Sequence, residues 1–423
     1  MIDYFKELGI EMDAYEDEIK NAYFNMTKKY PPEKYPDRYR VIRDAYETLI
    51  DNSKRDEYIL EIFDTRFKEI LNAGLDLAKS EKYDLAIANF EKVLEKYPEN
   101  IKVKKDLALC LMREKDYKRS SKVLKELVLR EPNNIEYYKL LMTSYLEGNE
   151  VKKLENVLIK GIRLKNAEVD FYLKLFDIYT DSEYRDYLKA IDILKDGIGN
   201  KNINSQRYKL YLKLIDISDK LDCKNDFTET CSLISQLNLS NDNYEDVKVK
   251  ITELCYRILK EFHFKNGIKL TTTALTLIDE NKDEIVLNEI ISLRRLFIEL
   301  YELEYDETIE NDFKRPLYYS VINKFLGDDI EIREGFKKVY SNFLVSIDHD
   351  KVNLLDSITN LKKNHKEIYG ITKGFCNDIL SVYSKAKKME SRTESIKGKD
   401  FGRREESKVK SLIKKVLKGI VDK

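Results

Sequence analysis

The chain has 423 residues, of which 42% are hydrophobic and 36% are charged, with six prolines, fourteen glycines and no tryptophan. Few helix breakers and abundant Lys, Glu, Leu and Ile predict an all-α protein of roughly two to four domains. The 76 basic and 77 acidic side chains nearly cancel, which argues against a chain built as a whole to bind nucleic acid.

The first part of the chain, residues 1–62, predicts a small domain of four helices. A short helix is expected over residues 3–9, a longer one over about 15–30 with Asp13 as its N-cap, a third over about 37–49, and a short fourth one directly after it. The second and third helices are separated by KKYPPEKYP, whose prolines cannot continue a helix and therefore predict a rigid loop.

The segments DYFKELGI, DEIKNAY, KKYPPEKYP and YRVIRDAYETLIDNSKRDEY follow one another in this region, and in this order they resemble a J domain. J domains stimulate ATP hydrolysis by DnaK-type chaperones through a His-Pro-Asp loop. The matching positions here are Pro31, Pro32 and Glu33. Only the central proline is kept, so the resemblance implies the J fold without the motif that stimulates the ATPase.

Two interpretations of this J-like domain stay open. It is either a docking or spacer module on a J scaffold, or a module that keeps a weak or altered contact with a DnaK-type chaperone. The second interpretation places that contact on the basic face of the second helix, formed by Lys20, Lys28 and Lys29.

From residue 67 onward the sequence repeats itself. Residues 67–100 and 101–134 align without a gap, and equivalent residues 34 positions apart are Tyr83 and Tyr117, Pro98 and Pro132, Gly74 and Ala108, and Ala86 and Ser120. The small residues are expected where two helices approach closely, and the prolines where the second helix stops. A period of 34 residues with two helices per unit resembles the tetratricopeptide repeat.

The repeats become less regular along the chain. A third unit over residues 135–168 keeps the spacing, and a fourth unit begins at Val169 with a longer turn between its helices. Residues 67–204 are therefore predicted to form tetratricopeptide repeats. Residues 205–383 are predicted to form degenerate helical repeats in which Pro316 interrupts a helix. The expected architecture is an α-solenoid of helix pairs.

Repeats of this family bind extended peptides or helices on a concave face that the first helix of each pair lines. The corresponding candidate residues are Leu71, Leu75, Lys105, Asp106, Lys139 and Leu140. Some members grip the C-terminal carboxylate of a chaperone with Lys, Asn and Arg side chains. The matching positions hold leucines and the acids Asp106 and Glu136, so we expect an anionic tail to be repelled.

The C-terminal segment differs in charge from the rest. Residues 385–423 hold fourteen Lys and Arg against six Asp and Glu, a local net charge of +8. Residues 384–404 are predicted to be a linker. Residues 405–421 are predicted to form a basic amphipathic helix with an apolar stripe from Val409 to Ile420. This helix could cap the solenoid, bind a partner groove or lie on a membrane surface.

The sequence indicates no enzyme, cofactor or metal site. Three histidines stand outside any metal or catalytic motif, the Asp-His-Asp at residues 348–350 is interpreted as solvated, and no phosphate-binding glycine loop is present. Five scattered cysteines and no signal-peptide pattern predict a cytoplasmic location. The leading hypothesis is a protein–protein interaction adaptor of co-chaperone type. An active J-domain co-chaperone and a membrane-surface scaffold are its alternatives.

Overall fold

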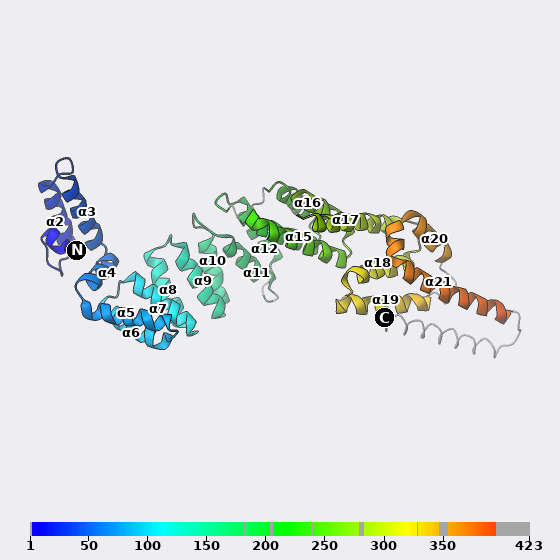
Figure 1. Cartoon of the computed structure of the whole chain (residues 1–423), viewed down its shortest axis with the longest axis horizontal. Helices are drawn as coiled ribbons and strands as arrows, with labels where there is room; N and C mark the ends of the chain where they lie inside the picture. Colours follow the sequence, from blue (N-terminus) through cyan, green and yellow to red (C-terminus); the bar gives the residue numbers. More distant parts are fainter. Residues whose placement is uncertain are drawn as a thin grey trace. The chain divides into compact units, whose positions relative to one another are not determined.

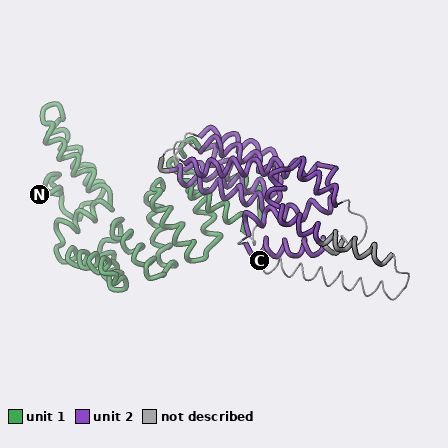
Figure 2. The backbone as a smooth tube through the Cα atoms, turned by 45° about the vertical axis from the view of Figure 1, so that its right-hand side comes forward, with its two compact units in different colours: residues 1–193, 200–203 green, residues 194–199, 204–423 purple. Residues whose placement is uncertain are grey.

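A computed structural model describes residues 2–181, 183, 185–203, 206–237, 241–278, 283–327, 329–346 and 354–394. In these ranges the chain forms helices α1 to α21 and no strand (Figure 1), which confirms the predicted all-α class. The chain divides into two compact units (Figure 2). The first comprises residues 1–193 and 200–203, and the second comprises 194–199 and the chain from 204 onward.

The first unit begins with a four-helix domain. Its helices are α1 (Tyr4–Leu8), α2 (Glu16–Lys29), α3 (Pro36–Leu49) and α4 (Asn52–Ile62). The first three helices and Ala14 form one core, made of Phe5, Leu8, Ala14, Ile19, Ile42, Ala45 and Leu49, and Tyr58 and Ile59 of α4 pack against it. Apolar side chains recur on one face of each helix because the helices must cover each other.

The prediction that Asp13 caps α2 is wrong. The N-cap is Tyr15, and its backbone N–H donates to the Glu18 carboxylate at 2.8 Å. Glu18 stands three residues into the helix and satisfies a backbone donor that has no partner inside the helix. Glu18 is one of three acidic residues in the first turn, where negative charge also suits the helix dipole.

Four helix pairs follow, and the last helix of the fourth pair continues from the first unit into the second. They are α5 (Thr65–Lys79) with α6 (Tyr83–Lys96), α7 (Ile101–Arg113) with α8 (Tyr117–Arg130), α9 (Ile135–Glu147) with α10 (Val151–Gly161), and α11 (Val169–Thr180) with α12 (Tyr187–Gly199). The second helix of a pair also packs on the first helix of the next pair, as α6 does on α7 and α8 on α9. This neighbour-to-neighbour packing is typical of a solenoid.

The turns between the two helices of successive pairs repeat one backbone conformation. Glu81, Lys115 and Asn149 have positive φ angles of 59°, 61° and 53°, and they are spaced 34 residues apart. The corresponding residue of the fourth pair, Arg185, comes 36 residues after Asn149. The longer turn expected in the fourth unit is therefore confirmed.

The close helix approach at Gly74 leads to a first prediction. A Cβ atom at this position would lie 2.9 Å from Cε1 of Phe90, a side chain that is fully buried. We expect Gly74→Leu to lower the free energy of unfolding by about 1–3 kcal/mol, because the ring has no free space into which to move. Chemical denaturation of the full chain measures the loss. Ala73→Leu, one residue away on the exposed face of α5, is the control. Equal losses in both variants would contradict the repeat alignment that places Gly74 at the close helix contact.

The second unit is built from helices around one core, and several of them are longer than those of the first unit. They are α13 (Tyr208–Lys220), α14 (Lys224–Ile234), α15 (Asn241–Lys260), α16 (Phe264–Leu277), α17 (Glu284–Tyr305), α18 (Asn311–Leu326), α19 (Ile330–Ser346), α20 (Leu354–Asn364) and α21 (Lys366–Glu394). Buried side chains from all nine helices form a single hydrophobic cluster.

Two boundaries differ from the sequence-based expectation. Pro316 lies inside α18, and the helix continues through it. Pro316 stands in the second turn, where only one helical hydrogen bond is lost, and the fully buried Phe313 and Leu317 fix the helix on both sides. The predicted linker begins at residue 384, whereas α21 continues to Glu394. The predicted helix at 405–421 and the Asp-His-Asp at 348–350 lie outside the described residues.

Candidate protein-binding surfaces

The loop between α2 and α3 holds the positions that correspond to the J-domain motif. The Pro31 carbonyl accepts hydrogen bonds from the backbone N–H groups of Lys34 and Tyr35, at 3.1 and 3.0 Å. Pro31 is half-buried, while Pro32 and Glu33 are exposed. This loop therefore presents a carboxylate to solvent, but it has neither an imidazole nor a backbone N–H at position 31.

Aromatic contacts hold α2 and α3 together behind this loop. The rings of Tyr23 and Tyr46 stack with their centroids 4.2 Å apart. The hydroxyls of Tyr23 and Tyr39 lie 3.5 Å apart, and this contact together with burial raises the pKa of Tyr23 to about 12. These contacts fix α2 and α3 against each other and so hold both ends of the loop in place.

The basic face of α2 contains two of the three predicted lysines. Lys20 and Lys28 are exposed and stand four residues to either side of Phe24, so the three side chains share one stripe of the helix. The Lys28 ammonium lies 4.2 Å from the centroid of the Phe24 ring, which is 57% exposed, and Lys20 pairs with Glu16. Lys29 faces the Tyr30 ring at 5.4 Å instead. An exposed aromatic ring between two cations fits an acidic partner with an apolar contact point.

The six predicted residues of the repeat groove lie on the first helices of three successive pairs. Leu71 and Leu75 belong to α5, Lys105 and Asp106 to α7, and Lys139 and Leu140 to α9, and all six are half-buried. The Lys139 ammonium forms an ion pair with Glu168 at 3.4 Å. Leucines beside partly covered charges make a surface suited to an amphipathic peptide segment.

Asp106 leads to a second prediction, because burial raises the pKa of its carboxyl above the ordinary value. A raised folded-state pKa means that the fold favours the neutral acid, so this contribution to stability is complete at low pH and is lost as the pH rises through the folded-state pKa. We expect Asp106→Asn to raise Tm by ~1–2 °C at pH 7, and to change it little at pH 3. Calorimetry at both pH values measures this, with the exposed Asp84→Asn as control.

A gain in Tm that is equal at both pH values would show that the Asp106 carboxyl titrates normally.

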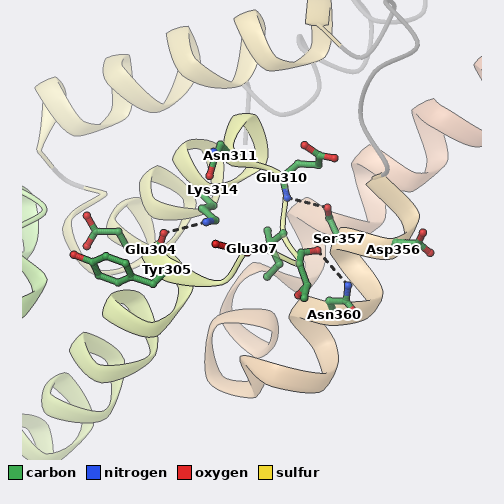
Figure 3. Close-up of a pocket in the computed structure, with 11 residues that line it drawn as sticks. Glu304, Tyr305, Glu307, Glu310, Asn311, Lys314, Asp356, Ser357 and Asn360 are labelled. Carbon is green, nitrogen blue, oxygen red and sulfur yellow. Dashed lines mark hydrogen bonds between the residues drawn. The ribbon is translucent and has the colours of Figure 1, made fainter.

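The second unit contains a polar cavity of about 610 Å³ that the sequence did not reveal (Figure 3). Lys314 is 7% exposed and donates to the Glu304 carbonyl at 3.0 Å, and the Asn360 amide donates to the Thr308 carbonyl at 3.2 Å. The cavity is lined by Glu304, Tyr305, Glu307, Thr308, Ile309, Glu310, Asn311, Lys314, Asp356, Ser357 and Asn360. Its walls come from two segments about fifty residues apart, so no local motif could have indicated it. The hydrogen bond from Asn360 to Thr308 ties the α17–α18 loop to α20.

Within the described ranges, no group of three or more His, Cys, Asp or Glu side chains is placed to hold a metal ion. Among the described helices, none has the length and apolarity needed to span a membrane.

Family comparisons match two parts of the first unit. Residues 3–58 match the DnaJ domain, and residues 77–144 match the tetratricopeptide repeat. The chain therefore contains a DnaJ domain followed by tetratricopeptide repeats, which confirms both resemblances. Neither family is a catalytic one.

Curated DnaJ proteins are similar to the N-terminal region of this chain. The chain is 44% identical over 61 residues to the chaperone protein DnaJ of Lactococcus lactis subsp. cremoris (strain MG1363), and 46% identical over 61 residues to that of Streptococcus mutans serotype c. Each match covers 13% of this chain and 16% of the relative. Among solved structures, Naa15/Naa10 bound to HypK-THB aligns with 92% of this chain and 66% of its own at 13% identity. Its TM-score of 0.32 is too low to support an argument.

Proposed function

We propose that this protein is an interaction adaptor of co-chaperone type. In this proposal the repeats bind a partner or client protein, and the J domain serves as a docking module. The observation that carries the proposal is the presence of a DnaJ domain and tetratricopeptide repeats in one compact unit. Both modules act by binding other proteins, so any ATP turnover belongs to a partner. The cysteines are free and four of the five are buried, which suits the reducing cytoplasm we propose as its location.

The proposal assigns the α2 stripe of Lys20, Phe24 and Lys28 to an acidic protein surface. A DnaK-type chaperone is the partner that the J fold suggests. The loop at Pro31 to Glu33 lacks the histidine of the family motif, so the contact is proposed to position the chaperone without stimulating its ATPase. Chaperone binding would use the exposed face of α2, whereas ATPase stimulation would use the loop, so the chain can keep the first without the second.

The test is single-turnover ATP hydrolysis by a DnaK-type chaperone from the same host, with the purified full chain added. We expect the hydrolysis rate to stay within twofold of the rate without it, whereas a DnaJ protein carrying His-Pro-Asp serves as positive control. A several-fold increase would overturn the proposal and favour the active co-chaperone. Pro31→His with Glu33→Asp need not restore stimulation, because Phe24 and Asn25 also alter the basic face.

The binding role of the repeats is tested by recovering partners from the native host with the full chain as bait. The variant Leu71→Glu with Leu140→Glu changes only half-buried side chains of the proposed groove, and we expect it to lose the partners that the parent recovers. Lys118→Glu, exposed on the second helix α8, is the matched control. Retention of the same partners by both variants would remove the groove from the proposal.

A further inference from the structure

The fourth helix, α4, is bound on one side to the J domain. The Tyr58 hydroxyl accepts the backbone N–H of Tyr4 at 2.8 Å, and the rings of these two residues stack at 4.8 Å. The Arg55 guanidinium donates to the Ala14 carbonyl at 2.8 Å. These contacts reach back to the start of the chain, so α4 closes the J domain.

The same helix is buried on its other side among the repeats. Leu60 is 2% exposed, and it belongs to the core of the first repeats together with Phe90, Val93 and Leu107. Its neighbour Ile59 packs against both cores, that of the J domain and that of the repeats. The two hydrophobic cores therefore meet along α4.

Polar contacts also join α4 to the repeats along this boundary between the two cores, which is called the seam below. The Ser53 hydroxyl accepts the backbone N–H of Ile101 at 3.3 Å, and the Asp56 carboxylate accepts that of Glu99 at 3.0 Å. Ile101 is the first residue of α7, where helical backbone donors lack partners within their own helix, and Glu99 directly precedes the N-cap Asn100. Side chains of α4 thus satisfy backbone groups that belong to the repeats.

Ion pairs add two further contacts across the seam. Arg130 at the end of α8 lies 3.3 Å from Asp51, and Lys102 in α7 pairs with Glu57. On the chain itself, α4 ends at Ile62 and α5 begins at Thr65. Two intervening residues leave no length for a flexible linker.

We propose that α4 is a shared helix: it completes the J domain, caps the open end of the first repeat, and thereby holds the α2 face and the repeat groove in one fixed orientation. The first repeat of a solenoid exposes a core face that needs such a cap. Combined with the proposed function, this arrangement presents a partner on α2 and a client in the groove at a constant distance. The fixed orientation itself does not depend on which proteins bind.

The first experiment is amide hydrogen exchange on the full chain. Leu60→Ala is expected to accelerate exchange at least tenfold in α5 to α7, because it empties the seam core. Leu49→Ala, which is fully buried in the J-domain core alone, is expected to accelerate exchange in α1 to α3 first. Unchanged exchange in α5 to α7 of the Leu60 variant would overturn the proposal.

The second experiment leaves the cores intact and measures the orientation directly. Spin labels at Lys34→Cys in the J loop and Lys152→Cys on α10 are placed in a Cys223→Ser background, since the other four cysteines are buried. We expect a narrow distance distribution that broadens in Lys102→Glu with Arg130→Glu. The exposed pair Lys118→Glu with Lys122→Glu makes the same charge change away from the seam and should leave the distribution narrow.

A broad distance distribution in the parent itself would show that the J domain moves freely relative to the repeats, and the shared-helix proposal would fail. Because both measurements use the chain without any partner, this failure would leave the proposed adaptor function untouched. Equally, a failed partner recovery would not affect the seam.

Discussion

Gly267→Ala is expected to destabilise the second unit, although alanine is the better helix former. Gly267 lies in α16 against α17, and a Cβ atom there would stand 2.5 Å from Cζ of Phe297 and closer still to two other ring carbons. Phe297 is fully buried in the core of this unit. Overpacking costs about 1–3 kcal/mol and occasionally more, which exceeds the gain of up to ~1 kcal/mol from removing a helical glycine.

The matched control is Gly374→Ala in α21, where an added Cβ atom meets nothing within 4 Å. This substitution should stabilise the protein by up to ~1 kcal/mol, because only the helix propensity changes. Thermal unfolding followed by calorimetry is expected to shift in opposite directions in the two variants. A shift of the same sign and size would show that α16 and α17 are not in close contact at this glycine.

The helix pairs of the first unit could be predicted because the same close helix contact and the same tight turn recur every 34 residues. Gly74 and Ala108 provide the close approach, and Glu81, Lys115 and Asn149 provide the left-handed turn at the same spacing. The second unit offers no such recurrence. Residues 205–383 could therefore be predicted only as degenerate helical repeats, and the end of α21 falls in the predicted linker.

The missed features involve residues whose partners are distant in sequence. A proline in a helical pattern predicts an interruption, and Pro316 was therefore expected to end a helix. The burial of Phe313 and Leu317, which keeps the helix continuous, depends on other helices and cannot be seen in the sequence. Asp56 lies inside the segment that resembles a J domain and Leu60 lies just after it, and nothing local shows that the two residues contact the repeats. The roles predicted for the lysines of α2 and for the groove residues stay predictions.

Asp306→Ala is expected to cause the second large loss of stability, by about 1–3 kcal/mol at pH 7, because it leaves the buried His365 without its hydrogen-bond acceptor. Asp306 follows α17 and is hydrogen-bonded by three residues after it. The backbone N–H and the hydroxyl of Thr308 donate to one carboxylate oxygen at 2.8 and 2.6 Å. The Asn364 amide and Nε2 of His365 approach the other oxygen at 3.2 and 3.0 Å.

His365 is 3% exposed, so the loss of Asp306 leaves an imidazole N–H without an acceptor in the interior. The same contacts join the α17–α18 loop to the junction of α20 and α21. Glu299 secures that junction from α17, where its carboxylate accepts the backbone N–H of Ile368 at 3.0 Å. Amide exchange in α20 and α21 should therefore rise in Asp306→Ala, while the exposed Asp312→Asn in α18 should leave it unchanged.

The pH dependence separates this explanation from a simple packing defect. Burial alone would raise the pKa of Asp306, but the hydrogen bonds from Thr308, Asn364 and His365 outweigh it and hold the pKa well below the ordinary value. A depressed folded-state pKa gives stability that is complete above the unfolded pKa of about 3.9, and this stability is lost as the pH falls through the folded-state pKa. The difference between parent and Asp306→Ala should therefore shrink as the pH falls below 4. A difference that stays constant down to pH 2 would mean that the ionised carboxylate is not what holds the loop.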